Sequence, residues 1–199
     1  MKHEFTQEVD ARIEANGRND SLRAISAAFM QASTAPKYSY NFSWLGRPII
    51  QYPQDIVAMQ ELIWRVQPDL VVETGIAHGG SLIFSASMLE LNAICGGPPS
   101  ARVLGIDIDI RAHNRSAIES HPMSRRVTMI EGSSIAPAVV QEVATLAARC
   151  QRVLVCLDSN HTHDHVLAEL DAYAPLTSVG SYCVVFDTIV EDLAQGTYP

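Results

Sequence analysis

The spacing of apolar residues along the chain changes near Pro68. Before this point, two stretches place an apolar residue at every third or fourth position, which predicts amphipathic helices. The first covers residues 1 to about 34, a mostly polar stretch with apolar residues such as Ile25 and Phe29. The second runs from Gln54 to Val66 and is more apolar.

An irregular, aromatic-rich segment from Tyr38 to Pro53 separates these two helical regions. The favoured interpretation is a strap that packs over the core. The alternative is a lid or one wall of a substrate site.

After Pro68, short and almost uniformly apolar runs alternate with helical stretches. The runs predict strands at about 70–73, 102–107, 127–131, 152–157 and 181–186, and the stretches predict helices at about 81–91, 110–120, 136–148 and 164–173. Uniformly apolar strands are typical of parallel strands that helices cover on both faces. We therefore expect an α/β fold with a Rossmann-like, mainly parallel sheet, strand one central and order 3-2-1-4-5. Ligands bind such sheets beyond the carboxyl ends of the strands.

Length and composition fit one compact unit, because 199 residues with 47% hydrophobic content can bury a real core. Within it we expect an N-terminal helical and irregular cap region at 1–67 and a ligand-binding domain at 68–199. The net charge of −8 argues against a nucleic-acid partner. The sequence has no apolar run of membrane-spanning length, no signal-peptide core and no C-x-x-C pair among its cysteines, so we expect a cytoplasmic protein.

The first predicted strand ends in a glycine-rich turn, Glu73-Thr74-Gly75-Ile76-Ala77-His78-Gly79-Gly80-Ser81. Glycines let the backbone approach a ligand, and the following helix offers free N–H groups. The spacing differs from the G-x-G-x-x-G fingerprint of diphosphate binding. An acid ahead of the first glycine suits a cationic amino-acid ligand, and S-adenosylmethionine (SAM) fits. The candidate cofactor contacts here are Glu73, Gly75, Ala77, Gly79 and Ser81.

Acids stand at or near the ends of four predicted strands: Glu73, Asp107, Asp158 and Asp187. Converging carboxylates are costly unless a cation is present. Asp107 is placed to accept from ribose hydroxyls, whereas Asp109 is expected to cap the next helix. Asp158 and Asp187 are hard oxygen ligands suited to Mg²⁺, and Asp158 is also a candidate cofactor contact. For any one aspartate a helix cap is the simpler explanation, but for all four acids together a site for a cofactor and a metal is favoured.

Two other short motifs lie close to these acids. Gly132 and Ser133, with Ser134, follow the third strand and either hydrogen-bond an adenine edge or form a turn with a helix cap. His161 follows Asp158 by three residues, where a neutral imidazole can take a proton from a hydroxyl. His163 and His165 are assigned to the solvated start of a helix. The histidine spacing supports neither zinc nor non-haem iron.

With these motifs in place, the chain resembles the family labelled cephalosporin hydroxylase, which includes rhamnosyl O-methyltransferases. The resemblance runs from about Trp44 to Val190 and rests on residues 71–81, 105–109, 157–161 and 184–188. It implies a SAM-binding Rossmann-like domain with a divalent metal. By position it implies cofactor contacts at Glu73, Gly75, Ser81, Asp107 and Ser133, metal ligands at Asp158 and Asp187, and a base at His161.

The chain departs from the family pattern in two places. Phe186 precedes Asp187 where the family often has a second acid, so Thr188 or water is expected to complete the metal shell. The printed chain ends at Pro199, so we expect the C-terminal edge hairpin of such methyltransferases to be missing from it.

Together these observations predict a SAM-dependent, Mg²⁺-assisted O-methyltransferase that acts on a small hydroxylated acceptor, such as a sugar of a glycosylated natural product or lipid. The alternatives are an oxygenase, as the family label suggests, and a non-catalytic SAM-binding protein. We also expect a homo-oligomer.

Overall fold

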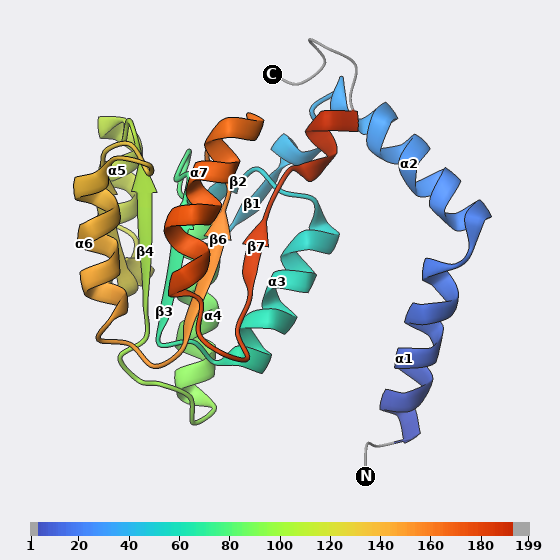
Figure 1. The fold of residues 1–199 in the computed structure, drawn as a ribbon, viewed down its shortest axis with the longest axis horizontal. Helices are drawn as coiled ribbons and strands as arrows, with labels where there is room; N and C mark the ends of the chain where they lie inside the picture. Colours follow the sequence, from blue (N-terminus) through green and yellow to red (C-terminus); the bar gives the residue numbers. More distant parts are fainter. Residues whose placement is uncertain (1–3, 193–199) are drawn as a thin grey trace. The chain divides into compact units, whose positions relative to one another are not determined.

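The computed structural model describes residues 4–192 (Figure 1). Contacts within the chain define two units, one holding residues up to Tyr38 and one spanning Ser39–Asp192. The second unit therefore begins before the expected boundary at residue 68. The reason is that Ile49 and Ile63 are fully buried in the same hydrophobic cluster as Val71 of the first sheet strand.

The first unit contains the helices α1 (Glu4–Gly17) and α2 (Asp20–Thr34), as the apolar spacing predicts. Asn19 separates them and caps α2, because its side chain accepts from the backbone N–H of Leu22 at 3.1 Å. The ring of Phe29 meets Tyr38 edge-on, with 5.5 Å between centroids.

The second unit is built on a five-stranded sheet in the order β5-β4-β3-β6-β7. All four pairings are parallel, which confirms the predicted strand order with strand one central. Its strands are β3 (Leu70–Thr74), β4 (Arg102–Asp107), β5 (Val127–Glu131), β6 (Val153–Leu157) and β7 (Cys183–Val185). Within residues 4–192 no antiparallel strand joins this sheet.

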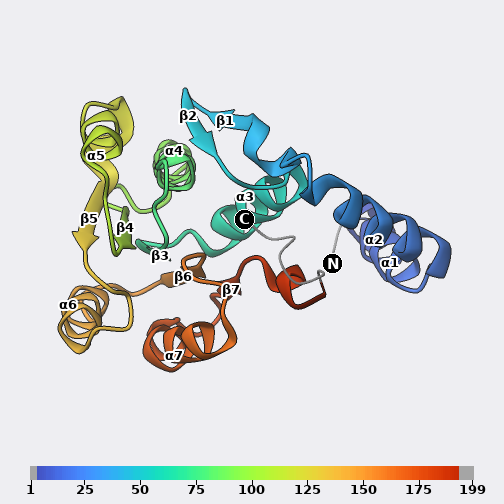
Figure 2. The same ribbon diagram turned by 90° about the horizontal axis from the view of Figure 1, so that it is seen from above.

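Helices cover both faces of the sheet, as the uniformly apolar strands predict (Figure 2). Side chains alternate along each strand, so Val71 packs toward one face and Val72 toward the other. The first face carries α3 (Pro53–Val66), α4 (Gly80–Ile94) and α5 (Ala112–Glu119), and the second carries α6 (Pro137–Ala147) and α7 (His163–Tyr173). The 3₁₀ turns are η1 (Tyr38–Asn41), η2 (Pro122–Arg126), η3 (Ala174–Leu176) and η4 (Thr188–Asp192). No helix among residues 4–192 is both long and apolar enough to cross a bilayer.

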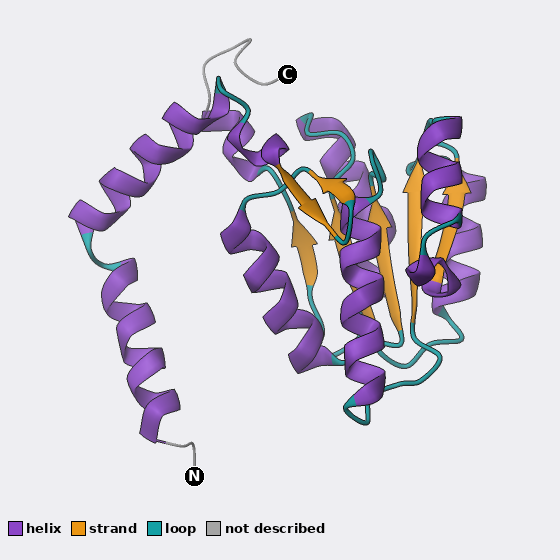
Figure 3. Ribbon diagram, turned by 180° about the vertical axis from the view of Figure 1, so that it is seen from behind, coloured by secondary structure: helices purple, strands orange, loops and turns teal. Residues whose placement is uncertain are grey.

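The aromatic segment before α3 is more regular than the sequence suggests. It forms an antiparallel hairpin of β1 (Phe42–Trp44) and β2 (Arg47–Ile49) on the α3 and α4 side of the sheet (Figure 3). Leu45 and Gly46 make its two-residue turn with φ values of 46° and 84°, the geometry of a type I′ turn. Trp44 packs edge-on against Phe84 at 4.9 Å. The segment is thus a packing strap, as the favoured interpretation holds.

Four loops of the sheet start from a fixed backbone, because the residue after each strand still bonds to a neighbouring strand. The donors and acceptors are Gly75 N–H to Ile106 at 2.8 Å, Gly132 N–H to Asp107 at 2.8 Å, Asp158 N–H to Thr74 at 3.0 Å and Phe186 N–H to Leu157 at 3.0 Å. The predicted ligand loops therefore begin on the rigid sheet.

Candidate active site

The glycine-rich turn lies directly against the loop after β6. Gly75 has a φ of +88°, and a Cβ built there would lie 2.0 Å from the carbonyl oxygen of Asp158. Only glycine fits that gap without moving the backbone. The turn after β3 and the loop after β6 thus share one tight backbone contact.

Asp107 holds the glycine-rich turn in shape. Its Oδ2 accepts from the backbone N–H groups of Ile76 at 2.8 Å and Ala77 at 3.1 Å, and its Oδ1 accepts from Asp109 at 3.2 Å. The expected cap by Asp109 is wrong: α5 starts after Arg111 and has no side-chain cap, because the backbone of Asp109 folds back onto Asp107.

Ala77 and Gly79 shape the same turn. Ala77 has a φ of 44°, and its carbonyl accepts from the Asn114 amide at 2.9 Å. The N–H of Gly79 donates to Ile76 within the turn, and a Cβ on Gly79 would lie 2.4 Å from the side chain of Ile118. Close packing on α5 therefore explains the glycine at position 79.

Two cavities meet at Gly75. The larger has a volume of about 200 Å³ and is lined by Asp107, Ile108, Ser133, Ser134 and His165, among others. The smaller has about 40 Å³ and is lined by Gln51, Ala77, Ser81 and Asp158, among others. Of the predicted cofactor contacts, six line one or both cavities: Gly75, Ala77, Ser81, Asp107, Ser133 and Asp158. Glu73, Gly79 and Gly132 line neither. The serines after β5 do not cap α6, whose N-cap is Ala136.

Glu73 lies inside β3, behind the turn, and only 3% of it is exposed. Burial raises the pKa of its carboxyl from the usual 4.5 to about 7, and the hydroxyls of Ser81 and Ser85 offset part of this rise. Ser85 lies 3.5 Å from Oε2, and Oε1 has no hydrogen-bond partner within residues 4–192. The site thus contains an acid that ionises near neutral pH and retains an unused acceptor.

Asp158, His161 and Asp187 come together at the ends of β6 and β7. Each offers one ligand atom, and these atoms lie within 4.8 Å of one another. His161 Nε2 is 3.4 Å from Asp187 Oδ2. Asp158 does not cap α7, whose N-cap is Thr162. The three residues that the sequence predicts for metal and base thus form one cluster.

Two carboxylates of this cluster, with Glu73 nearby, place like charges close together. Burial raises the pKa of Asp158 well above its usual range, and the nearby carboxylates of Asp187 and Glu73 raise it further; a hydrogen bond from Gln51 lowers it. Such a cost is relieved when a cation sits between the carboxylates. Asp187 has a φ of 55°, a left-handed backbone that Asp tolerates better than most residues. Thr188, the other predicted ligand, is exposed at the start of η4.

One residue of the aromatic segment and one of α3 lie close enough to Asp187 to sense its charge. The pKa values of the Tyr40 phenol and the Asp55 carboxyl are both raised, first by burial and then by the charge of Asp187. The aromatic segment also lines the smaller cavity together with Asp158, through Pro48, Ile50 and Gln51, as well as packing on the core.

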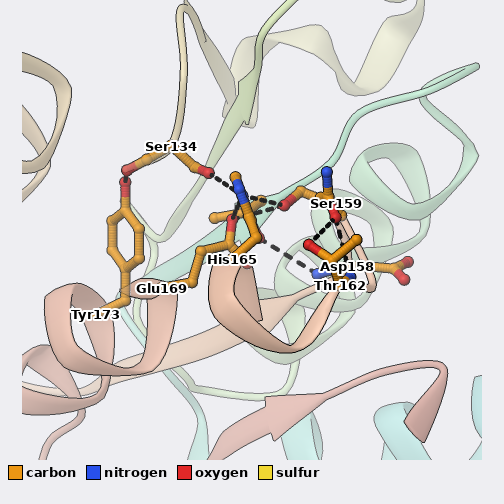
Figure 4. Close-up of polar contacts among 9 residues, drawn as sticks. Ser134, Asp158, Ser159, Thr162, His165, Glu169 and Tyr173 are labelled. Atoms are coloured by element: carbon orange, nitrogen blue, oxygen red, sulfur yellow. Dashed lines mark hydrogen bonds and ion pairs between the residues drawn. The ribbon is translucent and has the colours of Figure 1, made fainter. Parts of the chain in front are cut away.

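A polar network on α7 was not expected from the sequence (Figure 4). His165 Nε2 lies 3.1 Å from Ser134 Oγ, 3.3 Å from Ser159 Oγ and 3.4 Å from Glu169 Oε1. The assignment of His165 to a solvated helix start is wrong, because its side chain is 19% exposed; His163 is 73% exposed, as expected. The signal that the sequence offers is the i,i+4 spacing of His165 and Glu169 on the inner face of α7.

The comparisons with known proteins agree with this fold. A family model described as rhamnosyl O-methyltransferase/CmcI matches residues 36–199. The chain belongs to this family. The match takes in the hairpin, the sheet and all four acids at or near the strand ends.

The curated relatives that match the chain are named rhamnosyl O-methyltransferases. The rhamnosyl O-methyltransferase of Mycobacterium bovis is 33% identical over 138 residues, which are 67% of this chain and 51% of the relative. That of Mycobacterium leprae is 31% identical over 150 residues, which are 73% of this chain and 60% of the relative. The chain thus spans about half the length of the curated relatives it matches.

Solved structures support the fold. The apo structure of CmcI has a TM-score of 0.55 at 20% identity and covers 75% of this chain and 58% of that chain. A CmcI structure with Mg and SAM has a TM-score of 0.53 at 18% identity, with 75% and 59% coverage. At this level of identity the likeness identifies the fold, a SAM-methyltransferase-type α/β sheet.

Proposed function

We propose that the protein is a SAM-dependent, divalent-metal-assisted O-methyltransferase that methylates a hydroxyl of a small molecule, a sugar of a glycosylated natural product or lipid. The observation that carries this is the contact at Gly75, because it places the candidate cofactor cavities against the loop of the carboxylate cluster. A methyl donor and a hydroxyl held by the cluster would then lie within reach of each other. The name of the mycobacterial relatives supports a sugar as acceptor.

In this proposal the two cavities hold the two halves of SAM. The adenosine lies in the larger cavity, where the remaining lone pairs of Asp107 accept from the ribose hydroxyls and Ser133 faces the base. The amino-acid half lies in the smaller cavity near Ser81. Glu73 lines neither cavity, so its carboxylate would act on the positive charge of the ligand only from behind the turn. Ala77, Gly79 and Gly132 act through the shape of the turns.

The donor set at the strand ends fits a hard divalent cation. Asp158 and Asp187 would hold Mg²⁺ through carboxylate oxygens, with water or Thr188 completing the shell. Bound there, the cation would orient the acceptor hydroxyl and lower its pKa. It would also offset the repulsion that raises the pKa of Asp158.

His161 is proposed as the general base. Its neutral imidazole removes the proton of the acceptor hydroxyl, and Asp187, 3.4 Å from Nε2, stabilises the imidazolium that forms. The hydroxyl oxygen then attacks the methyl carbon of SAM in line, and the sulfonium becomes a thioether. Holding the two reactants in this alignment is a term that can reach about 7–11 kcal/mol.

A test combines binding and turnover with a panel of rhamnosides and methyl-labelled SAM. His161→Ala is expected to slow methyl transfer roughly 10²–10⁴-fold and to leave the affinity for S-adenosylhomocysteine unchanged. His163→Ala is the matched control, since that histidine is on the same segment and 73% exposed. Asp158→Asn is expected to abolish turnover and to weaken Mg²⁺ binding. Turnover of the His161 variant near the wild-type rate would contradict the assignment of the base.

A non-catalytic SAM-binding protein is the second candidate, and Phe186 favours it. Phe186 packs against the core cluster where an acid often stands in the family, so it supplies no ligand to the cation. Binding of S-adenosylhomocysteine without measurable Mg²⁺ binding would support this candidate. The oxygenase alternative is less suited to the cluster, which pairs two carboxylates with one imidazole instead of the reverse. Assembly into a homo-oligomer stays a prediction, which light scattering tests.

A further inference from the structure

One group of side chains is not used by the proposed chemistry: His165, Glu169, Ser159, Ser134 and Tyr173. Figure 4 shows them meeting between α7 and the loops after β5 and β6. Three of them, His165, Ser134 and Ser159, line the larger cavity at Gly75. The network therefore forms one polar wall of the cavity that we assign to the adenosine.

Glu169 is the anchor of this wall. Its side chain is 1% exposed, and the hydroxyl of Ser159 donates to its Oε1 at 2.6 Å. A buried carboxylate needs polar N–H or O–H groups around it. Besides the Ser159 hydroxyl, Nε2 of His165 lies 3.4 Å from the same oxygen. Tyr173 donates to the backbone oxygen of Ser134 and so ties the loop after β5 to the same helix.

This environment selects one tautomer of His165. The Ser159 hydroxyl donates its one proton to Glu169, so its oxygen, 3.3 Å from Nε2 of His165, can only accept there, and Nε2 carries the proton. In the neutral ring, Nδ1 is then an acceptor. Nδ1 makes no hydrogen bond with other described residues, although the ring lines the cavity. The cavity thus offers a preset acceptor to its ligand.

We propose that His165 is a specificity-determining residue that recognises the exocyclic amine of a 6-aminopurine, with Glu169 as the positioning residue that sets its tautomer. The inference rests on the proposed function, which places a purine nucleoside in this cavity. Apolar contacts from Ile106 and Ile108 suit the faces of a planar base, and the acceptor on His165 suits an edge that donates. A 6-oxopurine presents an acceptor at the same place and would be disfavoured.

The experiment measures calorimetric affinities of the full chain for S-adenosylhomocysteine and for S-inosylhomocysteine, which differ in the 6-amino and 6-oxo groups. The wild type is expected to prefer the amino compound by at least about tenfold, the scale of one or more hydrogen bonds. His165→Gln places its amide near the position of Nε2 and lacks an acceptor at Nδ1, so the preference should fall to about threefold or less. His163→Gln is the control and should keep the full preference.

Glu169→Gln gives a readout that a merely structural role would not move. An amide at position 169 can donate to Nε2, which allows the proton to shift to Nδ1. The variant should therefore bind the 6-oxo compound more tightly than the wild type does, while its affinity for the 6-amino compound falls.

The outcomes separate this inference from the proposed function. If the wild type binds neither compound, the proposed function fails. If it binds both and the His165 and Glu169 variants keep the wild-type ratio, the inference is overturned and the function stands. Circular dichroism identifies a variant that does not fold, and the other variant then decides, because each predicts a changed ratio by itself.

Discussion

Glu73→Gln is expected to remove much of the pH dependence of folding stability between pH 4.5 and about 7, the interval over which burial raises the pKa of this carboxyl. In the unfolded chain the carboxyl returns to its usual pKa, so the folded state holds its proton to higher pH than the unfolded state does. The stabilisation is therefore complete below pH 4.5 and is lost as the pH rises to about 7.

The magnitude follows from the same interval. The pKa is raised from 4.5 to about 7, which at about 1.4 kcal/mol per pH unit costs about 3.5 kcal/mol of stability above pH 7. Solvent screens the charge of Glu73 only weakly, because the residue is only 3% exposed. The charge of Glu73 also raises the pKa of Asp158. Replacing that charge by an amide therefore lowers the pKa of Asp158, which further reduces the dependence of folding stability on pH.

Urea unfolding followed by circular dichroism, at several pH values between about 5 and 8, tests this prediction. The free energy of unfolding of the wild type should fall with pH more steeply than that of Glu73→Gln. Glu61→Gln, at an exposed position of α3, is the control and should run parallel to the wild type. Parallel curves for the wild type and Glu73→Gln would refute the reasoning, because they would mean that Glu73 ionises alike in both states.

Three further substitutions test the turn and the hairpin. Asp107→Ala should weaken binding of S-adenosylhomocysteine by about 1.5–3 kcal/mol in calorimetry, since it removes hydrogen bonds to a charged group; an unchanged affinity contradicts the ribose assignment. Gly75→Ala should cost at least about 2 kcal/mol in urea unfolding, because the new Cβ meets backbone, whereas Gly46→Ala, with nothing within 4 Å, should cost about 1 kcal/mol for its φ alone. Trp44→Phe should cost about 1 kcal/mol in the same assay, because the 2.9 Å bond from Nε1 to Ser87 is lost; no loss would mean that water replaces that bond.

The sheet was predictable because burial on both faces leaves an unbroken apolar run at each strand. The hairpin before α3 was not, because its turn places Leu45 at a φ of 46°. Two-residue type I′ turns usually carry Asn-Gly or Gly-Gly, which can be recognised in a sequence. A leucine there gives no local signal, and the tertiary packing of Trp44 on α4 holds the turn instead.

The candidate site, like the fold, could be predicted from the sequence only in part. The acids at the strand ends were predictable, since parallel strands bring their carboxyl ends to one edge. The burial of His165 was not, because a position near a helix start is usually solvated. The loop after β5, about thirty residues earlier in the chain, covers His165. Ser134 of that loop contacts both His165 and Tyr173 of α7. Only the fold brings these elements together.

The loops of the site begin with amides that remain bonded to the sheet, at Gly75, Gly132, Asp158 and Phe186. In native-state hydrogen exchange these four amides should be retained as long as those of the strands, because they open only when the sheet itself opens. The amide of Ala77, held by a side-chain carboxylate in an exposed turn, should exchange sooner. Motions that admit a ligand would therefore be confined to the loop tips, while the first residue of each loop stays fixed on the sheet.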